Sequence, residues 1–280
     1  MIETKTQGIE TAANYKGGPL PHSEWRVVDK PLADLWLQKN TENRKLRRMQ
    51  SEKFMRDITS GDREVTHQGI AFDVEGVLID GQHTLKAISD TDRSLYLLVT
   101  YNLPKRAKLV VDCGAARTNF DRIHLSGRSG SKTDAAVARI LCSTRRATPM
   151  EVIHSFEAHK DRIDLVNSLF PEGERRYVAI APVIAVLVRA SYHVDRAVLR
   201  RFCEIMINSS PDRDRPGEIA VLKLRDFLVR GKHSGTESYY DEVRDRVRYT
   251  LRHFLENKPM GQLRREEVEI FPLPSEAEPQ

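Results

Sequence analysis

The spacing of apolar residues along this chain changes from helical to alternating after the first sixty residues. Leu46, Met49, Phe54 and Ile58 recur at roughly helical spacing, so residues 31–62 are expected to form a helix, a loop and a second helix. The stretch THQGIAFDVEGVLID that follows alternates apolar and polar residues around DVEG, with Gly76 suited to the turn. That alternation predicts a β-hairpin.

Two further segments complete a small mixed unit. Residues 82–92 return to the helical period and place Leu85 and Ile88 on one face. Residues 94–103, SLYLLVTYNL, are rich in aliphatic and aromatic side chains, as expected of a buried strand. The order strand, strand, helix, strand indicates an α/β or α+β unit.

Beyond residue 130 the pattern is almost entirely helical. Thr148, Pro149 and Glu151 form a helix start, with the threonine as N-cap and the glutamate closing a capping box. Ser131 or Thr133 is expected to cap the helix before it. Later helices are predicted over 178–192, 195–208, 217–230 and 236–257.

Changes of composition divide the chain. The Gly-rich segment 125–134 is expected to link two domains, and the Pro- and acid-rich C-terminal residues to be disordered. The predicted parts are a polar tail at 1–24, a mixed domain at 25–125, a helical domain at 131–270 and a disordered tail at 271–280.

The composition indicates a globular protein. Of 280 residues, 40% are hydrophobic and 30% are charged, enough for a core and a charged surface. No run approaches the ~20 apolar residues that cross a bilayer, and the N-terminus has no apolar signal segment, so no membrane partner and a cytoplasmic location are expected. Cys113, Cys142 and Cys203 are isolated, which predicts free thiols.

A net charge of +5 and a pI of about 9.1 indicate a mild preference for anionic partners. Segment 43–53 has more bases than acids and is the best candidate for contact with an anion. The segments 196–201 and 244–253 are expected to be solvated helix faces, although basic helical surfaces could also bind DNA.

The stretch LIDGQHTLKAI concentrates polar groups where a strand turns into a helix. Gly81 permits the turn, and the first helical turn after it presents N–H groups that favour an anion such as phosphate. Asp80 could hold a metal ion, orient His83 or accept a proton, and His83 could donate a hydrogen bond or act in acid–base chemistry. The alternative is that Asp80 only caps the helix while His83 packs against the strand.

The context of this corner resembles the ParB/sulfiredoxin-like superfamily, in particular members with a D-G-Q-H-R-L signature from phages and mobile elements. The resemblance covers about residues 35–125 and includes Asn43–Arg44 before the corner and VVDCGAARTNFDRI after it. It implies an α+β fold, with a small mixed-sheet N-terminal domain followed here by an all-helical C-terminal domain. It also implies a nucleotide ligand (CTP, ATP or ADP) with Mg²⁺.

Carried over by position, the resemblance makes Asp80 and His83 the catalytic candidates, with Asp80 also the metal ligand. The implied nucleotide-binding residues are Arg44, Gly81, Gln82, Thr84, Asp112, Arg117 and Thr118.

One position departs from the signature: Thr84 stands where the superfamily has arginine. A hydroxyl cannot bind phosphate as a guanidinium does, and losing that contact would cost about 1.5–3 kcal/mol. Either Arg117, Arg44 or Lys86 supplies the charge, or the nucleotide chemistry has weakened.

Other candidate residues are less specific. His67 and Gln68 could face the same cleft as His83 or form a polar strand edge. GRSGSK at 127–132 lacks the phosphate-loop pattern and is expected to be a linker. The histidines of the helical half show no metal-binding spacing.

These observations favour a nucleotide- or phosphate-binding protein that acts on or near DNA in a phage or mobile-element setting, with NTP hydrolysis or phosphoryl transfer as the candidate reaction. A homodimer is compatible with this function. The first alternative is a non-catalytic DNA- or protein-binding module. The second is a nuclease, for which no acidic cluster is visible.

Overall fold

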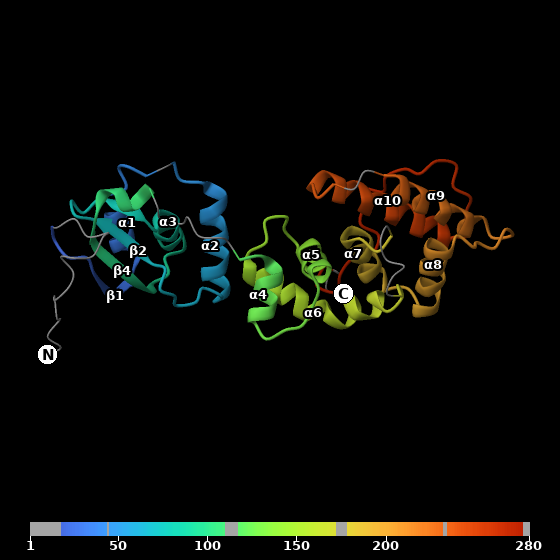
Figure 1. Cartoon of the computed structure of the whole chain (residues 1–280), viewed down its shortest axis with the longest axis horizontal. Helices are drawn as coiled ribbons and strands as arrows, with labels where there is room; N and C mark the ends of the chain where they lie inside the picture. The colour runs from blue at the N-terminus through green and yellow to red at the C-terminus, as the bar shows by residue number, and fades with distance from the viewer. Residues whose placement is uncertain (1–17, 44, 110–116, 172–177, 232–233, 277–280) are drawn as a thin grey trace. The chain divides into compact units, whose positions relative to one another are not determined.

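The computed structural model describes residues 18–43, 45–109, 117–171, 178–231 and 234–276. The chain divides into two compact units, an N-terminal unit over Met1–Ala116 and a helical unit over Arg117–Gln280. Figure 1 shows the strands in the first unit and helices alone in the second. The expected α+β class, with helices following a mixed sheet, is confirmed.

The N-terminal unit is built on a four-stranded sheet in the order β1-β4-β2-β3. The β1–β4 and β2–β3 pairs are antiparallel, whereas β2 and β4 are parallel. Its elements are β1 His22–Val28, α1 Lys30–Leu37, α2 Arg48–Ser60, β2 Ile70–Asp73, β3 Leu78–Asp80, α3 Gln82–Thr91, β4 Leu95–Leu103 and the 3₁₀ turn Lys105–Leu109.

Helix α3 fixes this unit by packing its apolar stripe into the core. Leu85 and Ile88 are fully buried, as their spacing predicts, and they share a cluster with Ile70 and Val99 of the sheet. Trp36 of α1 joins the same cluster. The hairpin turn between β2 and β3 is also as predicted, with Gly76 at a φ of 75°.

Strand β1 was not predicted from the sequence. Residues 22–24 belong to the predicted polar tail at 1–24, but in the structure they begin a seven-residue strand that pairs along its whole length with β4. Six of its seven residues are exposed, so the strand shows no alternation of buried and exposed positions that a hydropathy pattern could reveal.

The helical unit contains seven helices in its described residues: α4 Asn119–Leu125, α5 Lys132–Leu141, α6 Pro149–Asn167, α7 Ala181–Ala190, α8 Arg196–Asn208, α9 Pro216–Arg230 and α10 Glu237–Leu255. Ser131 and Thr148 are the N-caps of α5 and α6, each within a complete capping box. Helix α7 is buried on nearly all sides, as expected of a helix with so few polar residues.

The domain boundary lies between residues 116 and 117, not at 125. Ile123 of α4 is buried in the core of the helical unit, which places this helix there. The Gly-rich segment 125–134 therefore joins two helices within one unit and is not an interdomain linker.

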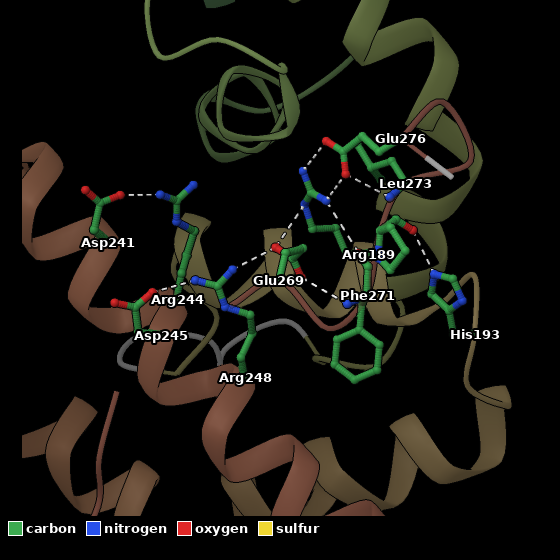
Figure 2. Close-up of polar contacts among 11 residues, drawn as sticks. Arg189, His193, Asp241, Arg244, Asp245, Arg248, Glu269, Phe271, Leu273 and Glu276 are labelled. Carbon is green, nitrogen blue, oxygen red and sulfur yellow. Dashed lines mark hydrogen bonds and ion pairs between the residues drawn. The ribbon is translucent and has the colours of Figure 1, made fainter. Parts of the chain in front are cut away.

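The segment after α10 also differs from expectation. Residues 271–276, predicted to begin a disordered tail, are fixed to the helical unit: Phe271 and Leu273 are buried in its core. Arg189 of α7 holds both oxygens of Glu276, at 2.6 and 2.9 Å, as Figure 2 shows. Glu269 bridges Arg189 and Arg248 of α10. We call residues 264–276 the C-terminal strap.

Among the described residues, no helix is long and apolar enough to cross a membrane.

Replacing Leu273 with alanine is expected to destabilise the helical unit by about 2–4 kcal/mol, because a 2% exposed side chain is removed from a packed core. Urea unfolding followed by far-UV circular dichroism measures this, since helices of this unit dominate the signal. Fluorescence of Trp25 and Trp36, the chain's two tryptophans, reports the N-terminal unit as an internal reference. Val268→Ala, at a position that is 68% exposed, is the matched control. Equal midpoints for the two variants would contradict the packing of the strap.

Candidate functional site

The N-terminal unit contains a cavity of about 530 Å³ at the corner between β3 and α3. Its wall comes from the loop before α2, from α2 itself, from the segment that leads into β2 and from the first turn of α3. The residues that line it are Glu42, Asn43, Arg47, Gln50, Phe54, Arg63, Gln68, Gly69, Ile79, Asp80, Gly81, Gln82, His83, Thr84 and Lys108. The structure thus brings together Asp80, Gly81, Gln82, His83 and Thr84 in one cavity.

Gly81 makes the corner possible because it is the N-cap of α3 with a φ of 94°. A Cβ at this position would lie 2.4 Å from the Cδ1 atom of Ile70, a buried residue of β2. The Asp80 carboxylate accepts the Gly81 N–H at 2.7 Å. The N-cap residue of α3 is this glycine, which has no side chain to cap the helix, and Asp80 stabilises the turn through the Gly81 N–H.

A chain of amide side chains connects the loop before α2 to the corner between β3 and α3. Asn43 donates to the Leu78 carbonyl at 2.6 Å and to Asn40 at 2.7 Å. Asn40 in turn donates to Oε1 of Gln82 at 3.0 Å. Because the Gln82 oxygen is used, its NH₂ group is the part that can serve a ligand as a donor.

His83 is only 8% exposed and is held by the loop before α2. Its Nε2 accepts the backbone N–H of Arg47 at 3.1 Å. In this contact the Nε2 atom acts as the acceptor. His83 therefore ties the loop to α3, and its Nε2 is not available to a ligand in this conformation.

Arg63 supplies the positive charge that Thr84 lacks. Its guanidinium donates to Oγ1 of Thr84 at 3.3 Å and lies 4.5 Å from the ring centroid of Phe54. No carboxylate of the described residues lies within ion-pair distance, and its Nε is buried without a hydrogen-bond partner. Burial lowers the pKa of this guanidinium below its ordinary value, while the charge of Asp57 acts in the opposite direction.

Two other cations could have supplied the charge beside Thr84, namely Lys86 and Arg44. Lys86, one of the three residues named as alternatives for the missing charge, forms an ion pair with Asp90 at 2.5 Å and does not line the cavity. Arg44 lies outside the described residues, as does Asp112.

Arg117 and Thr118 belong to the helical unit. Thr118 has a local role there as the N-cap of α4, within a capping box that it forms with Asp121. Of the two residues expected at the start of the hairpin, Gln68 lines the cavity and His67 does not.

The cavity offers little for a metal ion by itself. Its carboxylates are Asp80 and Glu42, and the ion pair with Lys108 holds the pKa of Glu42 below its ordinary value. Across the described ranges, no three His, Cys, Asp or Glu residues gather in a metal-binding group. Mg²⁺ is often held by a single carboxylate together with phosphate oxygens and water. Asp80 could be that carboxylate.

Sequence reasoning missed Arg63, Phe54 and Asn40 as parts of this site. Arg63 is a single basic residue after a helix end, outside the dense basic segment 43–53. Its contact with Thr84, 21 positions away, depends on how α2 and α3 pack and leaves no local pattern.

Comparison with known proteins finds no match among family models, curated proteins or solved structures.

Replacing Gly81 with alanine is expected to destabilise the N-terminal unit by about 2–4 kcal/mol, through an unfavourable positive φ and a clash with Ile70. Gly76→Ala is the matched control, because Gly76 also has a positive φ but no atom lies within 4 Å of an added Cβ. Gly76→Ala should lower the free energy of unfolding of the N-terminal unit by only about 1–2 kcal/mol. Tryptophan fluorescence in urea measures both variants. A Gly81→Ala variant no less stable than Gly76→Ala would show that the corner is not tightly packed.

Proposed function

We propose that the cavity at the β3–α3 corner binds the phosphate groups of a nucleotide or of a similar phosphate-bearing ligand. The observation that carries this proposal is Arg63, a partly buried guanidinium that lines the cavity and whose buried Nε has no hydrogen-bond partner; Asp57 is the carboxylate whose charge acts on it, and no ion pair joins the two. Removing a charge from water is costly unless a counter-charge is supplied. A bound anion would supply it.

Phosphate is the anion that suits the surrounding groups. Backbone N–H groups at a helix N-terminus attract anions, and α3 begins at the cavity with no side-chain cap. Arginine binds phosphate oxygens in a bidentate manner. Gln82 also lines the cavity, and its NH₂ group is a further donor. The wall thus offers mainly donors, which matches a ligand rich in acceptor oxygens.

The size of the cavity supports a ligand larger than phosphate alone. Its volume of about 530 Å³ lies within the ~300–1,000 Å³ typical of sites for small organic ligands. The resemblance to the ParB/sulfiredoxin-like superfamily favours CTP, ATP or ADP with Mg²⁺, for which Asp80 would be the carboxylate ligand in the cavity. The proposed action on or near DNA in a phage or mobile-element setting rests on that resemblance.

The contacts in the cavity favour binding of a nucleotide over its hydrolysis or phosphoryl transfer. His83, the candidate for acid–base chemistry or phosphoryl transfer, has its Nε2 committed to the Arg47 N–H. Asp80 bonds the Gly81 N–H through one oxygen, which suits an anchoring role. A nuclease with two metal ions would need more carboxylates than the cavity provides.

Arg63→Ala is expected to weaken nucleotide binding by about 10- to 100-fold, because it removes a charged hydrogen bond worth about 1.5–3 kcal/mol. Titration calorimetry with CTP, ATP, ADP and GTP in the presence of Mg²⁺ measures this on the full chain. Arg48→Ala is the matched control: it also removes one positive charge, but from α2, at a side chain that is 92% exposed. This variant should bind nucleotide like the wild type.

Two outcomes would count against the proposal. One is that none of the nucleotides, nor inorganic triphosphate, binds the wild-type chain. The other is that Arg63→Ala and Arg48→Ala weaken binding equally, which would mean that general charge and not the cavity attracts the ligand. Phosphate release measured on the same samples separates turnover from binding.

Asp80→Asn is expected to remove the Mg²⁺-dependent part of the affinity while leaving metal-free binding of inorganic triphosphate nearly unchanged. The asparagine oxygen can still accept the Gly81 N–H, but the neutral amide is a poor Mg²⁺ ligand. Titrations with and without Mg²⁺ measure the difference. If Mg²⁺ raises the affinity for nucleotide equally in the wild type and in Asp80→Asn, the metal does not bind Asp80.

A further inference from the structure

Strand β1 forms an open edge of the sheet. It is the first strand in the order β1-β4-β2-β3 and pairs with β4 on one side only. Figure 1 shows it beside β4 at the margin of the N-terminal unit. The strand runs for seven residues, His22–Val28, without proline. A long, regular edge of this kind is a template for pairing with another strand.

The opposite edge of the same sheet is protected. Strand β3 has three residues, and the backbone N–H of Leu78 already donates to the Lys39 carbonyl at 3.0 Å. The Leu78 carbonyl accepts the side chain of Asn43 at 2.6 Å. Short strands and covering loops are the usual protection of a sheet edge, and β1 has neither among the described residues.

The sequence of β1 is complementary to itself in antiparallel pairing. With a two-fold axis at Trp25, Glu24 of one copy lies opposite Arg26 of the second copy, and Arg26 opposite Glu24. Opposite charges that face each other across neighbouring strands stabilise the pairing. We propose that β1 pairs with β1 of a second copy of this chain, so that two four-stranded sheets join into one continuous sheet.

The side chains involved are partly exposed, although Arg26 also donates to the Tyr101 hydroxyl at 3.3 Å and lies over the ring of Trp36. Glu24 and Arg26 are about half exposed and lie 3.6 Å apart in the same strand, longer than a direct hydrogen bond. Trp25 is 44% exposed and Val27 is 62% exposed. Pairing through β1 would bring Trp25 of both copies together and remove these apolar surfaces from water.

The geometry also explains why the partner is a second copy and why the assembly stops at two. An isologous contact uses the same surface on both chains and closes on itself. Each sheet has one open edge among its described strands, so the dimer leaves only the protected β3 edges.

Charge reversal tests this pairing. Glu24→Arg places arginines opposite each other twice, and Arg26→Glu does the same with glutamates. Each variant alone is expected to raise the dissociation constant of the dimer by at least about tenfold, measured by analytical ultracentrifugation of the full chain. An equimolar mixture of the two variants should dimerise again, because every arginine then faces a glutamate. The double variant Glu24→Arg/Arg26→Glu should dimerise like the wild type.

Arg48→Glu makes on α2 the same charge change as Arg26→Glu makes on β1; it is the control for that variant and should not affect the dimer. Far-UV circular dichroism confirms that each variant is folded, and the mixture provides a test that does not depend on the behaviour of a single variant. A wild-type chain that stays monomeric at all concentrations overturns the proposal, including the case in which other residues of the chain cover β1. A dimer insensitive to both reversals, or variants that fail to recombine, overturns it as well.

Discussion

The positive φ of Gly81 is the constraint on which the N-terminal unit depends. The backbone must leave β3 and enter α3 within one residue, and a side chain there would require the buried side chain of Ile70 to shift. Once that turn is made, Leu85 and Ile88 reach the core between the sheet and the other helices, while the first turn of α3 faces the cavity. The fold and the candidate site are therefore fixed by the same residue.

Local patterns predicted much of this architecture. The capping boxes at Ser131 and Thr148 and the hairpin turn at Gly76 are determined by neighbouring residues, and the structure has them where the sequence places them. Strand β1 and the C-terminal strap escaped prediction because neither has a periodic pattern. Their positions are set by β4 in one case and by Arg189 and Arg248 in the other, residues far away in the chain.

The candidate site likewise contains residues that the local sequence predicts and a residue that only distant contacts place there. The corner residues Asp80, Gly81, Gln82 and His83 could be selected from the sequence because they are consecutive and belong to a strand-to-helix turn. Arg63 could not, because only the packing of α2 against α3 brings it to Thr84. The positive charge that contacts Thr84 thus comes from a segment outside the corner, which a motif read along the corner alone does not include.

The C-terminal strap has a consequence for the order of folding during synthesis. The core of the helical unit includes Ile123 near its beginning and Leu273 in the strap, so it cannot close until nearly all of this unit has left the ribosome. At about 5–20 residues per second, that leaves its apolar helices incompletely covered for on the order of ten seconds. The N-terminal unit has its complete core by β4 and can fold well before that time. Chaperone contact during translation should therefore concentrate on the second half of the chain.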